Sequence, residues 1–324
     1  MEPEKRAFIV RGLRLEAERI LAVELAPVEG DVPSWEPGAH LDLVVGDGTA
    51  RQYSLCGRPG APTLRIAVLH ETAGRGGSRW VHETLRPGQV VRVGGPRNHF
   101  VLEPAARYLF VAGGVGITPI LPMLGAASAA GADWELHYFG RSASAMAFLD
   151  ELEVHGERVH LHPEDRTGSL PDATRLSSRM AAPMGAPMGE GGLMYLCGPA
   201  GMLDAMEKAA AEDGWGDRLR LERFAAPAGD GAAAPAGSFD VHLAVSGTDL
   251  HVPAERSLLE VLREAGVDMV SDCEEGICGS CETRVVSGEI EHRDHVLTPQ
   301  ERAAGECLMA CVSRAAGSRL VLDL

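Results

Sequence analysis

The chain has 324 residues, of which 45% are hydrophobic and 23% charged, and its formal net charge is −16. This length favours two or three domains with folded cores, and the acidic balance argues against nucleic acid or an anionic membrane surface as the main partner. The N-terminal sequence MEPEKRAFIV lacks the pattern of a signal peptide, and no run of about 18 apolar residues predicts a membrane span. We therefore expect a cytoplasmic protein whose seven cysteines serve metal or redox chemistry more than disulfides.

Residues 1–103 have the pattern of an antiparallel β-barrel. Short alternating apolar runs are separated by turn signals such as Pro37-Gly38 and Pro87-Gly88, which is typical of such barrels. The predicted strands lie within residues 19–27, 39–45, 64–70 and 89–95.

Residues 104–226 alternate between strands and helices. An apolar strand at 107–114 precedes an Ala-rich helix, a second strand covers 134–140, and residues 193–212 form a strand, a turn and a helix. This alternation predicts a parallel sheet with helices on both faces. The biased segment AAPMGAPMGEGG at 181–192 is predicted to be a loop within this domain.

The remaining residues form a linker and a third domain. Residues 227–238 are rich in Ala, Gly and Pro and show no periodicity, which predicts a linker. The third domain covers 239–324; it starts with the strand-like FDVHLAV and ends with RLVLDL.

Three cysteines lie close together in the sequence DCEEGICGSC. The spacing Cys273-x4-Cys278-x2-Cys281 is that of a plant-type [2Fe–2S] cluster, which requires one distant fourth thiolate. Two candidates follow, Cys307 and Cys311. The alternative is a structural zinc site, but it leaves Cys273 without a role. Its four ligands would be Cys278, Cys281, Cys307 and Cys311. Glycines at 276 and 279 would permit the tight curl of the loop because they tolerate positive φ.

The C-terminal domain resembles a plant-type ferredoxin, and the whole chain resembles the phthalate dioxygenase reductase family. The family order is a flavin barrel, a nicotinamide domain and a ferredoxin, so the resemblance implies a multidomain fold. Its parts are an antiparallel β-barrel flavin domain, an α/β parallel-sheet nucleotide domain and an α+β ferredoxin-like (β-grasp) iron–sulfur domain. In the family the fourth ligand stands just before a VSRA sequence, which here follows Cys311. The implied ligands are Cys273, Cys278, Cys281 and Cys311, with Cys307 as the second choice for the last.

The sequence RQYS at 51–54 resembles the flavin signature of ferredoxin-reductase-like barrels. The guanidinium of Arg51 is suited to a flavin phosphate, because its planar fork matches phosphate oxygens better than an ammonium does. The resemblance implies that Tyr53 forms an aromatic wall and that Ser54 donates to the flavin ring. In the family a GRGGS sequence follows, and here it occupies 74–78.

In GRGGS, the backbone N–H groups of Gly76 and Gly77 and the hydroxyl of Ser78 form a predicted anion nest. PRNHF at 96–100 also resembles the family's stretch that closes the barrel. GRGGS is typical of the branch that uses FMN, so FMN is expected rather than FAD.

The nucleotide domain contains two predicted turns for the dinucleotide. AGGVGITPI at 112–120 follows a strand and opens a helix, a suitable place for phosphate, and Thr118 with Pro119 at the first helical position predicts the helix start. Its glycines are Gly113, Gly114 and Gly116.

The second turn follows a later strand of the same domain. The resemblance implies that Cys197, Gly198 and Pro199 line the nicotinamide. Phe224, in LERF, would cover the flavin face where the nicotinamide stacks, or it is simply a core residue.

The choice between NADH and NADPH rests on the adenosine end of the predicted site. Arg141 would suit the 2′-phosphate of NADPH, whereas an acidic neighbour such as Asp165 would suit the free hydroxyl of NADH. The resemblance favours NADH.

Taken together, these features imply a reductase that passes electrons from NADH to FMN, to [2Fe–2S] and to a separate Rieske-type oxygenase or demethylase. FMN can stand between a hydride donor and one-electron acceptors, and no side chain is needed as a general acid or base. No Cys-x-His pair for a Rieske cluster and no two-histidine, one-carboxylate grouping for iron stands out in the sequence, so the oxygen chemistry is expected on the partner. The alternatives are a reductase for a cytochrome P450 and, from another class, a non-catalytic redox sensor.

The expected docking face is acidic. Residues 237–324 contain 16 Asp and Glu residues against 7 Lys and Arg residues, a net charge of −9 out of the −16 of the whole chain. Asp272, Glu274 and Glu275 flank the cysteine loop and would present this charge to the electron acceptor, although solubility alone also explains an acidic surface.

Overall fold

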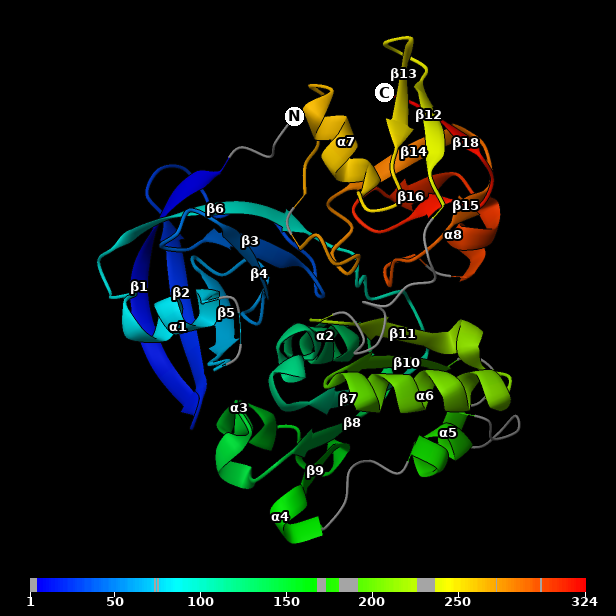
Figure 1. The fold of residues 1–324 in the computed structure, drawn as a ribbon. Coiled ribbons are helices and arrows are strands. Elements are labelled where there is room, and N and C mark those ends of the chain that lie inside the picture. Colours follow the sequence, from blue (N-terminus) through cyan, green and yellow to red (C-terminus); the bar gives the residue numbers. More distant parts are fainter. Residues whose placement is uncertain are drawn as a thin grey trace. The chain divides into compact units, whose positions relative to one another are not determined.

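The computed structural model describes residues 5–72, 74, 76–167, 173–180, 192–225, 237–271, 273–297 and 299–324 (Figure 1). The described residues before Phe224 form one compact unit, and those from Phe224 onward form a second. The predicted linker and the predicted loop at 181–192 lie almost wholly outside the described residues, and so does Asp272. Within the part of the chain that is described, no helix is long and apolar enough to cross a membrane.

The first unit begins with a six-stranded antiparallel sheet in the order β4-β3-β6-β1-β2-β5. Its elements are β1 (Arg6–Ala17), β2 (Ile20–Pro27), β3 (His40–Val44), β4 (Ala50–Ser54), β5 (Leu64–Leu69), α1 (Gly77–Glu83) and β6 (Val90–Arg97). A bridge between Leu55 and Ile66 connects the two edges of the sheet, so the sheet closes into a barrel. Both residues are fully buried in the barrel core. The predicted barrel is confirmed.

The second part of this unit is a five-stranded parallel sheet in the order β11-β10-β7-β8-β9. Its strands are β7 (Arg107–Gly113), β8 (Asp133–Gly140), β9 (Val159–Pro163), β10 (Gly192–Cys197) and β11 (Leu219–Glu222). Its helices are α2 (Ile117–Ala129), α3 (Leu149–Glu153), α4 (Glu164–Thr167), α5 (Ala173–Met180) and α6 (Ala200–Glu212), with short 3-10 turns at Gly114–Gly116, Ala143–Ala145, Gly156–Arg158 and Gly216–Arg218. Separate apolar clusters, one with α2 and one with α5 and α6, cover the sheet, as the strand–helix alternation predicts.

The start of α2 differs from the prediction. The helix begins at Ile117, so Thr118 and Pro119 are its second and third residues and Pro119 is not the first. The 3-10 turn at Gly114–Gly116 runs directly into the helix, and the Thr118 hydroxyl donates to the Val115 carbonyl at 2.9 Å instead of capping a backbone N–H. Proline is tolerated there because N–H groups in the first helical turn have no partner within the helix.

Ion pairs and backbone contacts hold the barrel against the nucleotide domain within this unit. Arg65 of β5 donates to both carboxylate oxygens of Glu151 in α3, at 2.6 and 2.9 Å, and its guanidinium lies over the Phe148 ring at 5.0 Å. The backbone N–H of Glu18 donates to the Ser144 carbonyl at 3.0 Å. A bidentate arginine–carboxylate pair restricts orientation as well as distance, so the two domains are fixed relative to each other.

The second unit contains a five-stranded mixed sheet in the order β13-β12-β18-β14-β16. Its elements are β12 (Phe239–Leu243), β13 (Thr248–Val252), α7 (Leu258–Glu264), β14 (Glu282–Ser287), β15 (Ile290–Glu291), α8 (Pro299–Ala304), β16 (Cys307–Met309), β17 (Arg314–Ala315) and β18 (Arg319–Leu322). The first and last strands, β12 and β18, pair in parallel at the centre, and α7 packs its buried residues into the same core. This is the β-grasp arrangement that the family resemblance implies.

Candidate functional site

The two flavin-binding sequences of the barrel meet in the structure. A Cβ added at Gly77 would lie 2.7 Å from Cγ of Arg51, so only glycine lets the α1 backbone approach this arginine. Gly76 has a φ of 89°, which places it in the left-handed region that glycine adopts readily. A guanidinium beside bare backbone is the donor set that a flavin phosphate requires, so these residues fit the group.

The other predicted flavin residues lie close to this cradle. Burial raises the pKa of Tyr53 to about 12, against the opposing charge of Arg51, so the phenol stays protonated. The Ser78 hydroxyl accepts from the backbone N–H of Glu71 at 3.1 Å, which fixes the GRGGS turn to the end of β5. Their contact with a flavin stays a prediction.

The two predicted nucleotide turns pack directly on each other, at the carboxyl ends of the neighbouring strands β7 and β10. A Cβ added at Gly116 would lie 2.3 Å from the Cys197 carbonyl oxygen, and one added at Gly198 would lie 3.1 Å from Cα of Gly113. A Cβ at Gly113 would meet Cδ of Pro199 at 2.6 Å. Gly114, by contrast, faces open space and has a φ of 56°. The turns thus lie at the carboxyl edge of a parallel sheet, where ligands bind in such folds.

A partly buried carboxylate, that of Glu222, lies between the flavin and nicotinamide residues. The Ser54 hydroxyl donates to Oε2 of Glu222 at 3.4 Å, although the two residues are 168 positions apart in the chain. Cys197 stands beside Glu222 in the register of β10 and β11. Burial raises the pKa of Glu222 to about 8, although the hydrogen bond from Ser54 opposes this. The pKa of the Cys197 thiol is also raised, first by burial and then by the charge of Glu222.

Glu222 was not among the residues predicted for the site. Its only sequence signal was its place in LERF, where a carboxylate ends an apolar strand two residues before Phe224. Phe224 itself is 43% exposed, so the interpretation of a core phenylalanine does not hold. Arg223, between them, is buried and forms an ion pair with Asp204 at 2.8 Å, which anchors the end of β11 to α6.

The two residues considered for the adenosine end are neighbours. The backbone N–H of Asp165 donates to the Arg141 carbonyl at 3.2 Å, and both residues are exposed. This edge of the sheet therefore has a side chain suited to the 2′-phosphate of NADPH, Arg141, and one suited to the free 2′-hydroxyl of NADH, Asp165.

Four cysteines of the second unit converge. Cys273, Cys278, Cys281 and Cys311 are all buried. Hydrogen bonds from the thiols of Cys278 and Cys311 lower the pKa of Cys273, and a hydrogen bond from Cys311 lowers the pKa of Cys281. Four sulfurs within hydrogen-bonding reach of one another, on a plant-type spacing, fit a [2Fe–2S] cluster.

The fifth cysteine lies in different surroundings. Cys307 is on β16, opposite Arg284 of β14, and is partly exposed. Its pKa is raised to about 11, first by burial and then by the carboxylates of Glu282 and Glu301. The thiol of Cys311, by contrast, shares hydrogen bonds with the sulfurs of Cys273 and Cys281. This position favours Cys311 over Cys307 as the fourth ligand, which stays a prediction.

The cysteine loop has the backbone that the sequence predicts. Gly276 and Gly279 have φ values of 70° and 75°, and a Cβ at Gly276 would meet Val312 at 2.6 Å. The Glu275 N–H donates to Sγ of Cys273 at 3.3 Å. The tight curl with N–H groups aimed at sulfur is therefore confirmed.

One grouping that does not stand out in the sequence is present in the structure. Glu135, His137 and His160 form a two-histidine, one-carboxylate group in the nucleotide domain. The sequence did not reveal it because His160 is on β9, and only the parallel pairing of β8 with β9 brings it opposite His137.

Comparison with known proteins identifies the C-terminal domain. Residues 241–316 match the family described as a 2Fe-2S iron-sulfur cluster binding domain. Over 320 residues the chain is 42% identical to the vanillate O-demethylase oxidoreductase of Pseudomonas sp. strain HR199, covering 98% of this chain and 99% of that protein.

Two solved structures extend the similarity to the whole fold. Phthalate dioxygenase reductase matches 98% of this chain and 97% of its own with 35% identity and a TM-score of 0.67. An intact type IV self-sufficient cytochrome P450 monooxygenase matches 99% of this chain with 46% identity and a TM-score of 0.90. The chain spans only 41% of that P450 protein.

Proposed function

We propose that this chain, which belongs to the phthalate dioxygenase reductase family, passes electrons to a separate Rieske-type oxygenase or demethylase in the cytoplasm. The oxygenase reductases of this family pass electrons from NADH through a flavin to a [2Fe–2S] cluster. The observation that carries the proposal is the presence of all three folded parts in one chain, matched over 98% of its length by a demethylase oxidoreductase. The cytoplasm also suits four cluster thiols, because thiols stay reduced there.

The residues of the chain supply binding and orientation. When bound there, a flavin would supply the chemistry that connects a two-electron hydride donor with one-electron acceptors. Arg51 and Gly77 would hold its phosphate, and Ser54 would approach its ring from β4. The turns at Gly113–Gly116 and Cys197–Pro199 would hold the dinucleotide at the sheet edge. Glu222 accepts a hydrogen bond from Ser54 and stands beside Cys197 in the strand register, so one partly buried carboxyl lies between the flavin and nicotinamide ends of the site.

A cytochrome P450 is the second candidate for the electron acceptor. The supporting observation is the 46% identity with the reductase portion of a self-sufficient P450. Reconstitution separates the two: the purified chain with NADH should support turnover by a Rieske-type oxygenase and be slower with a free P450 at equal concentration. Efficient turnover only with the P450 would replace the first proposal by the second.

We expect the flavin released by acid to be FMN, and Arg51→Ala to lower flavin affinity. Loss of a charged phosphate contact should weaken binding by about 1.5–3 kcal/mol, which is roughly 10- to 150-fold in Kd. Flavin fluorescence during titration of the flavin-free protein measures this. Arg92→Ala, an exposed arginine on β6, removes the same charge from the barrel and should bind flavin as the wild type does. FAD in the acid extract, or equal loss in both variants, would contradict the phosphate assignment.

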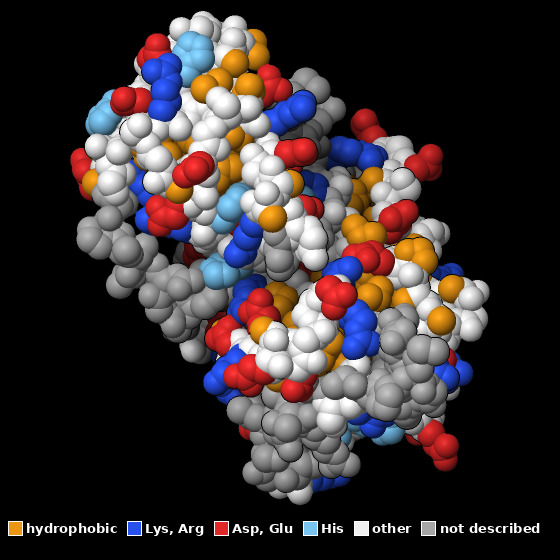
Figure 2. All heavy atoms as spheres, turned by 90° about the vertical axis from the view of Figure 1, so that its right-hand side faces the viewer, with side chains coloured by type: hydrophobic (Ala, Val, Ile, Leu, Met, Phe, Trp, Pro, Cys, Tyr) orange, Lys and Arg blue, Asp and Glu red, His pale blue; other side chains and the backbone are white. Residues whose placement is uncertain are grey.

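The proposed docking face surrounds the cysteine loop. Glu274 and Glu275 are the described carboxylates of this loop. Glu274 is ion-paired with Arg263 at 2.8 Å, so part of its charge is already compensated. Figure 2 shows acidic and basic side chains interspersed over the displayed face of the molecule. We therefore expect the attraction for the electron acceptor to come from a local excess of negative charge at the cysteine loop and not from a uniformly acidic surface.

We expect electron transfer to the partner to slow as salt rises from low to physiological strength, because surface attraction raises the encounter rate and ions screen it. Replacing Glu274 and Glu275 with Gln should reproduce the slowing at low salt. Stopped-flow reduction of the partner measures both effects, while NADH reduction of the flavin in the same samples should change much less.

A matched control is Asp240→Asn with Asp249→Asn. These exposed carboxylates lie on β12 and β13, at the opposite edge of the sheet from β16. The two substitutions remove the same charge as the Glu274 and Glu275 substitutions, and they should leave the rate of partner reduction unchanged. If both double variants slow the reaction equally, only net charge matters and the docking face is not at the cysteine loop.

A further inference from the structure

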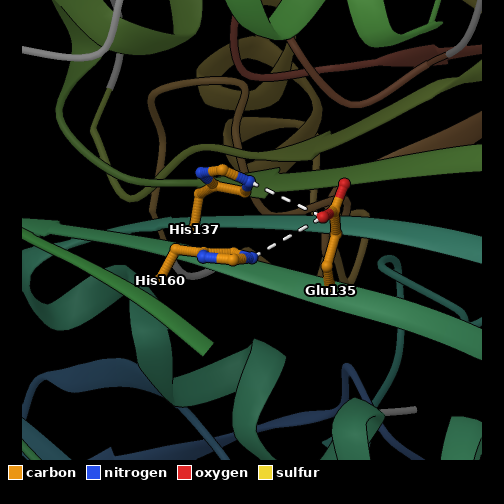
Figure 3. A group of neighbouring side chains, drawn as sticks. All are labelled: Glu135, His137 and His160. Carbon is orange, nitrogen blue, oxygen red and sulfur yellow. Dashed lines mark ion pairs between the residues drawn. The ribbon is translucent and has the colours of Figure 1, made fainter. Parts of the chain in front are cut away.

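A cluster of imidazole and carboxylate groups lies at one edge of the parallel sheet, apart from the nucleotide turns. Glu135 and His137 are two residues apart on β8 and therefore project from the same face of the sheet. His160 of β9 stands opposite His137 in the register. Figure 3 shows both imidazoles directed at one oxygen of the Glu135 carboxylate.

The separations between these groups are close to, and in part slightly larger than, those of ligands that share an ion. Oε2 of Glu135 lies 4.0 Å from Nε2 of His137 and 3.7 Å from Nε2 of His160, and all three ligand atoms lie within 4.8 Å of one another. These distances exceed the 2.7–3.2 Å that is typical of an N–H···O hydrogen bond. Bonds of about 2.0–2.2 Å to one ion separate two ligand atoms by at most roughly 4.2 Å, so a small closing movement completes the site.

Further side chains hold the ligands in place. Nδ1 of His137 lies 3.0 Å from Nε2 of His162. Here an imidazole stands where a metal-bound histidine usually has a carboxylate, a carbonyl or water, and it can orient the ring in the same way. If His137 donates through Nδ1, its Nε2 lone pair points toward Glu135 and His160. The His162 ring is itself stacked on Phe139, with centroids 4.4 Å apart.

Arg179 of α5 forms an ion pair with both oxygens of Glu135. Metal-bound carboxylates commonly accept such a hydrogen bond from a neighbouring side chain. The guanidinium also repels a cation, so the affinity of the site is limited to a moderate value.

We propose that Glu135, His137 and His160 bind one divalent transition-metal ion of the Zn²⁺ class, which joins β8 to β9 and, through Arg179, to α5. Two imidazoles with one carboxylate favour Zn²⁺, Cu²⁺ or Ni²⁺ over Mg²⁺ and Ca²⁺, which prefer oxygen ligands. In the general order of affinities, Cu²⁺ and Zn²⁺ bind such a site more tightly than Fe²⁺. Access is open because the His160 side chain is 42% exposed.

Calorimetric titration of the oxidised holoprotein with Zn²⁺ tests the proposal. The wild type should bind one ion in the micromolar range and unfold at a higher temperature with the ion present, because ligand binding to the native state stabilises it. Mg²⁺ at the same concentration should do neither. His160→Asn should weaken Zn²⁺ binding at least tenfold, since even residues that only orient a ligand contribute about 10–100-fold.

The matched control is His251→Asn. This exposed histidine also contacts a carboxylate, Asp240, at 2.8 Å, but it lies in the second unit and belongs to no group of three possible metal ligands among the described residues. Its Zn²⁺ affinity should equal that of the wild type. Cluster absorption and NADH oxidation verify that both variants fold and retain their cofactors.

Copper provides a readout of the ligand type. Cu²⁺ bound by imidazoles shows nitrogen couplings in its electron paramagnetic resonance spectrum, and in His160→Asn the couplings should fall from those of two imidazoles to those of His137 alone. Two results overturn the proposal: no Zn²⁺ binding in the micromolar range by the wild type, or binding by His160→Asn equal to the wild type. Either would leave the group as an ordinary contact between β8, β9 and Arg179.

Discussion

Replacement of Cys311 by serine should abolish assembly of the [2Fe–2S] cluster, whereas Cys307→Ser should leave the cluster intact. The sulfur of Cys311 exchanges hydrogen bonds with Cys273 and Cys281, so its loss opens one corner of the thiol group. Cys307 lies among carboxylates on β16. The visible absorption of the purified variants and their iron content per chain measure the result.

The two cysteine variants control for each other, because each removes one thiol from the same short segment. Circular dichroism of Cys311→Ser should show that its β-grasp sheet is retained. In the wild type and in Cys307→Ser the cluster potential should be on the order of −400 mV, as in plant-type centres. Loss of iron from Cys307→Ser with retention in Cys311→Ser would make Cys307 the fourth ligand.

The second large effect is expected from Glu222→Gln, in the pH dependence of stability. The pKa of Glu222 is raised from its ordinary 4.5 to about 8 by burial. The folded protein therefore keeps a proton that the unfolded chain releases above pH 4.5, so the stability of the wild type falls as pH rises from about 5 to 8. At 1.4 kcal/mol per pKa unit, the full loss is on the order of 5 kcal/mol.

Glutamine has nearly the same shape and no charge, so Glu222→Gln should escape this loss. The unfolding temperature of the variant minus that of the wild type should increase as the pH rises from 5 to 9. Thermal unfolding of the holoprotein at a series of pH values measures it. A difference that stays constant over this range would show that the Glu222 carboxyl does not titrate there.

Glu103→Gln is the control for Glu222→Gln. A hydrogen bond from Arg220 lowers the pKa of Glu103. The stability that the Glu103 carboxylate contributes is therefore fully present above its ordinary pKa, and it is lost only as the pH falls through the lowered pKa. Between pH 6 and 9 this variant should therefore differ from the wild type by a constant offset.

Local patterns in the sequence determined the fold and the metal chemistry of this protein. Cys273-x4-Cys278-x2-Cys281 lies within one loop, and the positive φ of Gly276 and Gly279 follows from the same few residues. Apolar alternation likewise determined the barrel and the parallel sheet, because burial of one face dictates the residue period.

Only the tertiary structure decided which distant side chains meet. Nothing in the spacing of the sequence links Ser54 to Glu222 across 168 residues, and it is the pairing of β10 with β11 that places Glu222 beside Cys197. The same holds for His137 and His160, which the β8–β9 register brings together. Sequence spacing predicts contacts made within a loop, a helix or a strand, whereas contacts between elements depend on how strands pair and which faces are buried.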